Sequence, residues 1–264
     1  MKILTCLKQV PEKDSRYKIN KAGTGISDEN LVFETNESDL YALEESLRLK
    51  EKVGGEVLAL SLGPERVAKI LRNALAMGAD SALHLKDKTF DGGDAWVTSQ
   101  IIVTAIRQKQ LDLILTGVQS EDMGYGQTGT MIAQLLGWPH ATIVTEVDVV
   151  DEGNRLRVKR ELGSNIFERI ELSLPAVLTI QSGIHQIRYV TLKGIMQAKN
   201  KPYKVITANE LSLEPQTMGA EGSKIKPQEL MVPEQKRQVV MIEGDIEVAA
   251  KLLMEKLQKE AKIL

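Results

Sequence analysis

The first half of the chain alternates short apolar runs with longer segments whose apolar residues recur at helical spacing. A short apolar run is typical of a buried strand, and helical spacing that ends at glycine is typical of a helix. The predicted strands are residues 3–7, Glu56–Leu62, Ser81–Leu85 and 111–116, and the predicted helices are Glu37–Val53, 65–77, about 94–108 and about 127–136. A long polar loop, residues 8–27, follows the first strand. This alternation predicts an α/β fold, with a mostly parallel sheet and helices on both faces.

The pattern changes after residue 140. Four strand-like segments follow one another without a helix between them, at residues 141–149, 155–161, 166–172 and Ala176–Ile180. We therefore expect an antiparallel extension of the sheet over about 141–180. A short amphipathic helix is predicted at about 191–200, and a final helix at 246–264 lies beyond a polar, proline-containing stretch, 201–237. The expected organisation is an α/β nucleotide-binding domain over 1–200 and a C-terminal arm with a docking helix over 201–264.

Composition limits the class of protein. Hydrophobic residues are 42% and charged residues 27% of the 264 residues, an ordinary globular balance, and no apolar run is long enough for a membrane span. A net charge of −2 and 4% aromatic residues argue against a nucleic-acid surface. One cysteine and an N-terminus without a secretory signal indicate a cytoplasmic protein.

The strongest candidate for a nucleotide site is the loop at residues 116–129. It follows an apolar strand and leads into a helix, and ligands of open parallel sheets bind at the carboxyl ends of strands, where a helix N-terminus offers free N–H groups to a phosphate. Gly124, Gly126 and Gly129 would let the backbone approach that phosphate. The loop matches neither the Walker lysine motif nor the dinucleotide fingerprint, so spacing also allows a turn whose polar residues merely cap the helix.

The sequence patterns around the three histidines and the single cysteine favour structural roles for these residues. His84, His140 and His185 lie on separate predicted elements without metal-ligand spacing, so no metal site is expected. Cys6 lies in the apolar first strand and is expected to be a buried small hydrophobe.

The short helix near residue 195 allows two interpretations. Leu192, Ile195, Met196 and Lys199 fall along one face. Such a face either packs on its own core or inserts into a groove of another protein. Periodicity alone favours the core.

The sequence is similar to the electron transfer flavoprotein β family from Met1 to about Leu211. The resemblance rests on short matches in the family's order: Lys8, Asn36, residues 42–50, residues 74–80, Gln127-Thr128-Gly129, residues 174–177 and Arg188-Tyr189. It implies a flavodoxin-like (adenine-nucleotide-hydrolase-like) domain that pairs with an α subunit. The long polar loop and the C-terminal arm would then be intersubunit contacts.

The resemblance also implies a cofactor site. In the family the β subunit holds AMP, while FAD is held mainly by the α subunit. The positions that match the AMP site are Cys6, Asn36, Leu62, Gly117, Gln119, Asp122, Gly126, Gln127 and Thr128, with Gly129 completing the last match. A bifurcating branch of the family replaces AMP with a second FAD and usually carries an Asp-Gly-Asp-Thr type loop. The sequence at residues 122–125 departs from that pattern, which favours AMP.

Partner residues follow from the same resemblance. Glu161 matches an acidic residue that pairs with an α-subunit arginine, and residues 192–199 match the recognition helix whose leucine, here Leu192, anchors in a dehydrogenase pocket. This favours docking for Leu192, Ile195, Met196 and Lys199. The expected function is an electron carrier of fatty acid oxidation, not an enzyme, which links acyl-CoA-type dehydrogenases to a membrane quinone oxidoreductase without entering the membrane. The alternatives are the β subunit of an NADH-oxidising bifurcating complex and a stand-alone nucleotide-binding module of the universal-stress type.

Overall fold

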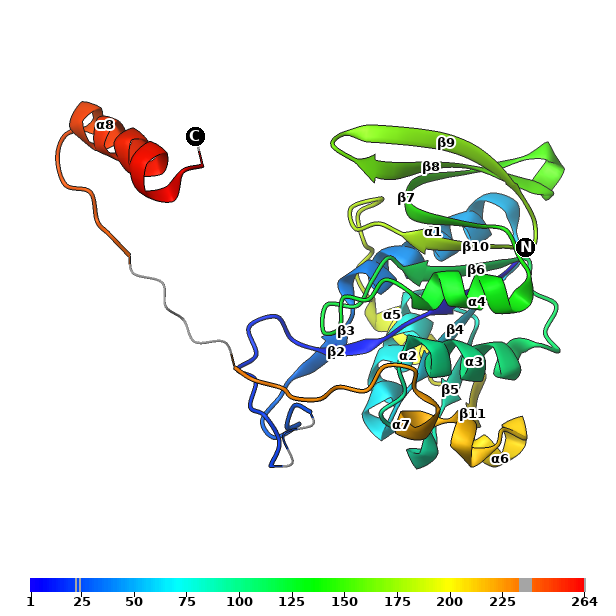
Figure 1. Ribbon diagram of the computed structural model, residues 1–264. Coiled ribbons are helices and arrows are strands. Elements are labelled where there is room, and N and C mark those ends of the chain that lie inside the picture. The colour runs from blue at the N-terminus through cyan, green and yellow to red at the C-terminus, as the bar shows by residue number, and fades with distance from the viewer. Residues whose placement is uncertain (22, 24, 233–238, 264) are drawn as a thin grey trace. The chain divides into compact units, whose positions relative to one another are not determined.

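The computed structural model in Figure 1 describes residues 1–21, 23, 25–232 and 239–263. The described chain forms two units. One comprises Met1–Lys18 and Ile26–Gln228, and the other comprises Ile19–Gly25 and Glu229–Leu264. The first unit holds the sheet and both hydrophobic cores, and the second holds the final helix.

Within the described ranges, nine strands form one sheet in the order β11-β5-β4-β1-β6-β10-β7-β8-β9. Their bounds are β1 Lys2–Cys6, β4 Glu56–Leu62, β5 Ser81–Leu85, β6 Leu113–Gly117, β7 His140–Val150, β8 Arg155–Gly163, β9 Ile166–Ser173, β10 Ala176–Ile180 and β11 Tyr203–Ile206. Every pair from β11 to β7 is parallel, and β8 and β9 continue the sheet antiparallel. The sheet confirms the predicted α/β class.

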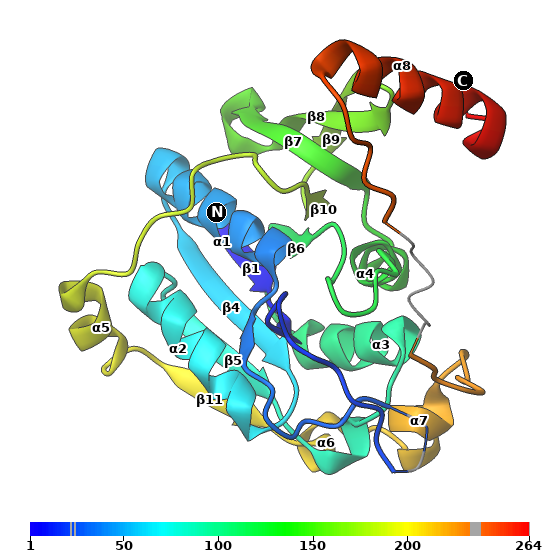
Figure 2. The same ribbon diagram turned by 90° about the vertical axis from the view of Figure 1, so that its left-hand side faces the viewer.

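Helices cover both faces of this sheet (Figure 2). Those of the first unit are α1 Glu37–Val53, α2 Ala68–Met77, α3 Ala95–Ile106, α4 Thr128–Leu136, α5 Leu192–Ala198, α6 Ala208–Leu211 and α7 Gly219–Gly222. Because successive side chains of a strand point to opposite faces, Ile3 of β1 joins the core under α1 and α2, and Leu4 joins the core under α3 and α4. No helix in the described part of the chain is long and apolar enough to cross a membrane.

The predicted antiparallel extension includes one strand too many. β10 lies between β6 and β7 and is parallel to both, so the antiparallel part is confined to the pairs β7–β8 and β8–β9. All residues of β10 are buried. A strand that is apolar on both faces is typical of the covered, parallel part of a sheet, and its uninterrupted sequence Ala-Val-Leu-Thr-Ile carries that signal.

The predicted boundary at residue 200 falls inside the first unit. β11 pairs in parallel with β5 at the edge of the sheet, and the unit continues to Gln228. Tyr203 reaches back with its hydroxyl to Nδ1 of His84, at 2.9 Å, while the other ring nitrogen of His84 lies 2.9 Å from the carbonyl of Gly63. His84 is thus a satisfied buried residue, as its strand pattern predicted. An edge strand this short, with one buried residue, lacks a clear sequence signal.

Two further segments can be compared with their predictions. Part of the predicted polar loop forms a two-stranded antiparallel pair, β2 Gln9–Pro11 with β3 Phe33–Thr35. In the second unit the final helix, α8, spans Ile246–Lys256 and continues as a π-helical turn over Leu257–Ala261. Residues 22 and 24 of the predicted polar loop, residues 233–238 of the predicted arm and residue 264 of the predicted helix lie outside the described residues.

Candidate functional site

The candidate site lies where the strand order reverses. From β1 the chain adds β4 and β5 on one side, then crosses to place β6 on the other side of β1. Ligands of open α/β sheets bind at the carboxyl ends of strands at such a switch point. Cys6, Leu62 and Gly117 are the last residues of β1, β4 and β6, so the structure brings these three predicted residues to one edge of the sheet. Burial raises the pKa of the Cys6 thiol, which supports its reading as an inert apolar residue.

Polar contacts hold the loop after β6 against the first turn of α1. The side-chain amide of Asn36 donates to the carbonyl oxygen of Gln119 at 2.9 Å, and its Oδ1 accepts from the backbone N–H of Glu121 at 3.0 Å. The hydroxyl of Ser38 donates to the same carbonyl at 2.8 Å. Asn36 occupies the N-cap position of α1, but its side chain bonds the loop and makes no capping bond to the helix. Asn36 and Gln119 are therefore in contact, as their joint prediction requires.

Asp39, which the sequence analysis missed, joins the ends of β1 and β6. Its Oδ2 accepts from the backbone N–H of Lys8 at 2.7 Å, and its Oδ1 accepts from that of Gly117 at 2.8 Å. Burial raises the pKa of Asp39 to about 7, although these backbone N–H groups act in the opposite direction. A Cβ at Gly117 would lie 2.4 Å from Asp39 Oδ1, so this position requires glycine. The sequence carries no local signal for this role, because a capping pattern would direct an acidic side chain at this helix position to the backbone of Asn36 and not to Lys8 and Gly117.

Two lysines neutralise the carboxylates of this loop. Nζ of Lys8 lies 2.6 Å from Oδ1 of Asp122 and donates to Ser120 Oγ at 3.2 Å. Nζ of Lys13 lies 3.1 Å from Oε1 of Glu121. Without these ammonium groups, two adjacent carboxylates would repel an anion at the start of α4. Their pairing makes the loop compatible with a phosphate.

The residues that open α4 leave its first turn available. Gln127 is the N-cap and Thr128 the first helical residue, and the described side chains provide no cap to this turn. Gly126 has φ +61° and is exposed. A Cβ at Gly129 would lie 2.6 Å from Thr179 Cγ2, so glycine lets the first turn pack directly on the sheet. Free N–H groups at a helix N-terminus can bind a phosphate. The geometry therefore favours a phosphate site over the interpretation in which Gln127 merely caps the helix.

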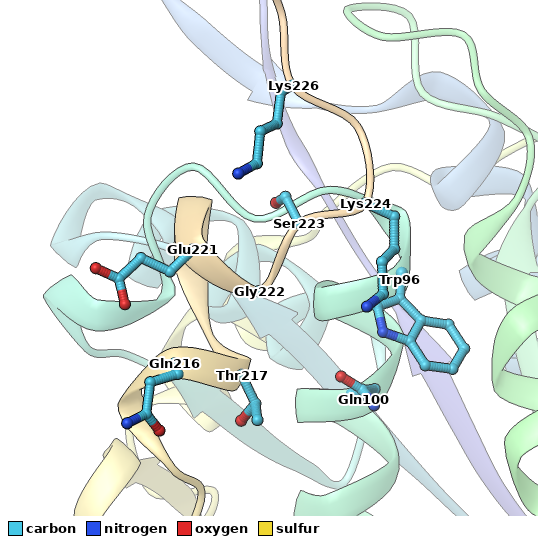
Figure 3. A pocket seen from close by; sticks show the side chains of 9 residues that line it. All are labelled: Trp96, Gln100, Gln216, Thr217, Glu221, Gly222, Ser223, Lys224 and Lys226. Carbon is cyan, nitrogen blue, oxygen red and sulfur yellow. The ribbon is translucent and has the colours of Figure 1, made fainter.

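Two surface cavities of the first unit lie on other segments. Figure 3 shows one of about 280 Å³, in which Trp96 and Gln100 of α3 face the segment around α7. The second, of about 680 Å³, includes Met1, Asp112 and the turn after β7. Neither contains a predicted site residue.

The predicted docking residues are exposed on α5. Leu192 is 82%, Met196 70% and Ile195 46% exposed, and Lys199 is also exposed, so this face does not pack on the core. Glu161 lies apart from them on β8, where it accepts from Gln181 Nε2 at 3.4 Å. The structure thus gathers four of the five predicted partner-binding residues on α5 and its C-cap, which is Lys199.

Comparison with known proteins gives a consistent family. The sequence model described as "Electron transfer flavoprotein domain" matches residues 24–211. "Electron transfer flavoprotein subunit beta" of Methylophilus methylotrophus is 36% identical over 256 residues, which cover 96% of this chain and 97% of the relative. The protein of the same name from Homo sapiens is 33% identical and covers 81% of this chain and 84% of its own. "Caffeyl-CoA reductase-Etf complex subunit CarD" of Acetobacterium woodii is 36% identical, with 84% of each chain covered. The chain therefore belongs to the electron transfer flavoprotein β-subunit family, whose members are electron carriers rather than enzymes.

Proposed function

We propose that this chain pairs with an electron transfer flavoprotein α subunit in the cytoplasm. The heterodimer carries electrons from acyl-CoA-type dehydrogenases of fatty acid oxidation, through FAD held mainly by the α subunit, to a membrane quinone oxidoreductase. The observation that carries the proposal is the exposed apolar face of α5 in a member of this family. Covering an apolar residue as exposed as Leu192 with a partner's pocket removes apolar surface from water and so stabilises the complex.

The switch-point residues fit AMP as the nucleotide of this subunit. The first turn of α4, at Gln127 and Thr128, would hold the phosphate, and Gly126 would let the backbone approach it. Asn36 keeps the loop in place, and Lys8 offsets the charge of Asp122. AMP has no redox chemistry, so it would act by filling the crevice and fixing the loop, while FAD supplies the electron transfer.

A second candidate is the β subunit of an electron-bifurcating complex that oxidises NADH and holds a second FAD in place of AMP. The reason to test it is that two relatives are named after reductases of CoA esters. One is the caffeyl-CoA reductase subunit above, and the other is "Acryloyl-CoA reductase electron transfer subunit gamma" of Anaerotignum propionicum, 34% identical over 268 residues. The loop sequence at residues 122–125 supports AMP instead.

The docking role is tested by Leu192→Ala in the purified heterodimer, with Val32→Ala as the control because Val32 is also an exposed apolar residue, at 59%. We expect Leu192→Ala to raise the KM for a reducing acyl-CoA dehydrogenase about tenfold, since an interface anchor contributes on the order of 1–2 kcal/mol. Nucleotide and flavin content should stay unchanged in both variants. Equal KM values for the two variants would reject the anchor.

A further inference from the structure

We propose that a cluster of ion pairs and hydrogen bonds between α1 and residues 181–190 fixes the docking face of α5, and that Arg188 is its central positioning residue. We call this cluster the α1 clamp; it consists of Glu44, Glu45, Glu51, His185 and Arg188. The proposal rests on the docking role of α5 proposed above. It adds the residues that hold the docking helix in its binding orientation.

The clamp holds a segment that has no strand or helix of its own. Arg188 donates from Nε to Glu44 Oε2 at 2.8 Å, from Nη2 to Glu44 Oε1 at 3.1 Å and from Nη1 to Glu51 Oε1 at 2.7 Å. Nε2 of His185 lies 2.5 Å from Oε2 of Glu45. Both contacts precede α5 by a few residues, so they fix the point from which the helix starts.

Burial of two glutamates restricts the clamp to one position on α1. The side chains of Glu44 and Glu45 are 1% and 3% exposed. Burial disfavours ionisation of Glu44, but hydrogen bonds from Arg188 and Arg48 hold its pKa below the usual value. A buried carboxylate without a partner is strongly unfavourable, so the segment has one favourable position on α1. The planar guanidinium of Arg188 bonds both carboxylate oxygens of Glu44, from Nε and Nη2, a paired geometry that an ammonium group does not reproduce.

The other end of α5 is held on α2. Nζ of Lys201 donates to the carbonyls of Leu75 and Ala79 at 2.8 and 2.7 Å, at the C-terminal end of α2. Gly194 allows close packing, since a Cβ there would lie 2.3 Å from the carbonyl oxygen of Ala76. Polar contacts thus fix α5 at both ends while Leu192, Ile195 and Met196 are exposed. A helix ordered in advance loses less conformational entropy when a partner binds.

The test uses Arg188→Lys in the purified heterodimer, with Arg48→Lys as the matched control. Arg48 also bonds Glu44, but from within α1, so its replacement leaves residues 181–190 attached. We expect Arg188→Lys to speed backbone hydrogen exchange in residues 185–199. We also expect it to raise the KM for an acyl-CoA dehydrogenase that reduces the unmodified complex by roughly three- to tenfold, with kcat unchanged, the factor expected for the lost preorganisation of a short segment. Arg48→Lys should change neither quantity.

The outcomes separate the clamp from the docking role. If Leu192→Ala raises the KM and Arg188→Lys does not, the positioning role is wrong and the docking role stands, whatever the exchange rates. If neither variant changes the KM, the docking role itself fails. Should Arg188→Lys not fold, Glu51→Ala replaces it, because the Glu51 side chain is 60% exposed and its removal takes away the two hydrogen bonds that Arg188 donates to it from Nη1 and Nη2.

Discussion

Asp39 is the residue through which pH acts on the switch point. Its pKa of about 7 in the folded chain is above its ordinary value of 3.8. Between these values the folded state binds a proton that the unfolded state does not, so the contribution of Asp39 to the free energy of unfolding falls as pH rises from about 4 to about 7. Above pH 7 the contribution levels off.

Asp39→Asn tests this dependence. The amide does not titrate, so the difference in unfolding free energy between wild type and variant should decrease across that pH window, as measured by denaturant unfolding at several pH values. At pH 7 the variant should still be less stable by about 1–3 kcal/mol, because one amide oxygen replaces two carboxylate oxygens that accept from Lys8 and Gly117. A difference that is constant with pH would contradict the assignment.

Gly126 and Gly137 allow a second comparison of single residues. Both are left-handed glycines at the ends of α4, with φ +61° and +68°, so alanine costs each about 1 kcal/mol. Only Gly126 lies at the candidate phosphate site. Gly126→Ala should lower the AMP released from the purified heterodimer severalfold, and Gly137→Ala should not. Equal AMP content in the two variants would exclude a nucleotide at this turn.

At the scale of elements, periodicity located the long helices and central strands. The bounds of α1 and β4 agree with the prediction because a glycine ends α1 and a Gly-Pro turn follows β4. β10 was predicted with its observed bounds but with the wrong pairing, and β11 was not predicted, because pairing partners are set by tertiary contacts. Nothing local distinguishes a strand that returns to the sheet centre, as β10 does, from one that continues a meander.

Truncation tests the observed end of the first unit. A chain that ends at Gln228 keeps β11 and the buried residues Ile206, Ala208 and Met218, whereas a chain that ends at residue 200 loses them. We expect the first to unfold cooperatively near the wild-type temperature. The shorter chain should lose several kcal/mol of stability, since one buried large apolar side chain contributes about 1.5–3 kcal/mol. Equal thermal midpoints for the two truncated chains would support a domain boundary at residue 200.

At the scale of the whole molecule, the position of the candidate site was predictable in outline. Glycines and polar residues after a strand indicated the loop, and the family resemblance indicated Asn36 and Gln119, which the fold brings together from distant segments. Asp39 and Lys13 were not identified, because their partners Gly117 and Glu121 become neighbours only when β1 and β6 pair. The exposure of the α5 face was likewise not predictable from helical spacing alone, because it depends on how the helix packs on the rest of the chain.

The most direct test of the central claim is to count the FAD and AMP released per heterodimer after co-expression with the α subunit. The account predicts one FAD and one AMP. Two FAD molecules without AMP would contradict the simple carrier and support the bifurcating complex, and failure to form a flavin-containing complex would contradict the proposed function altogether.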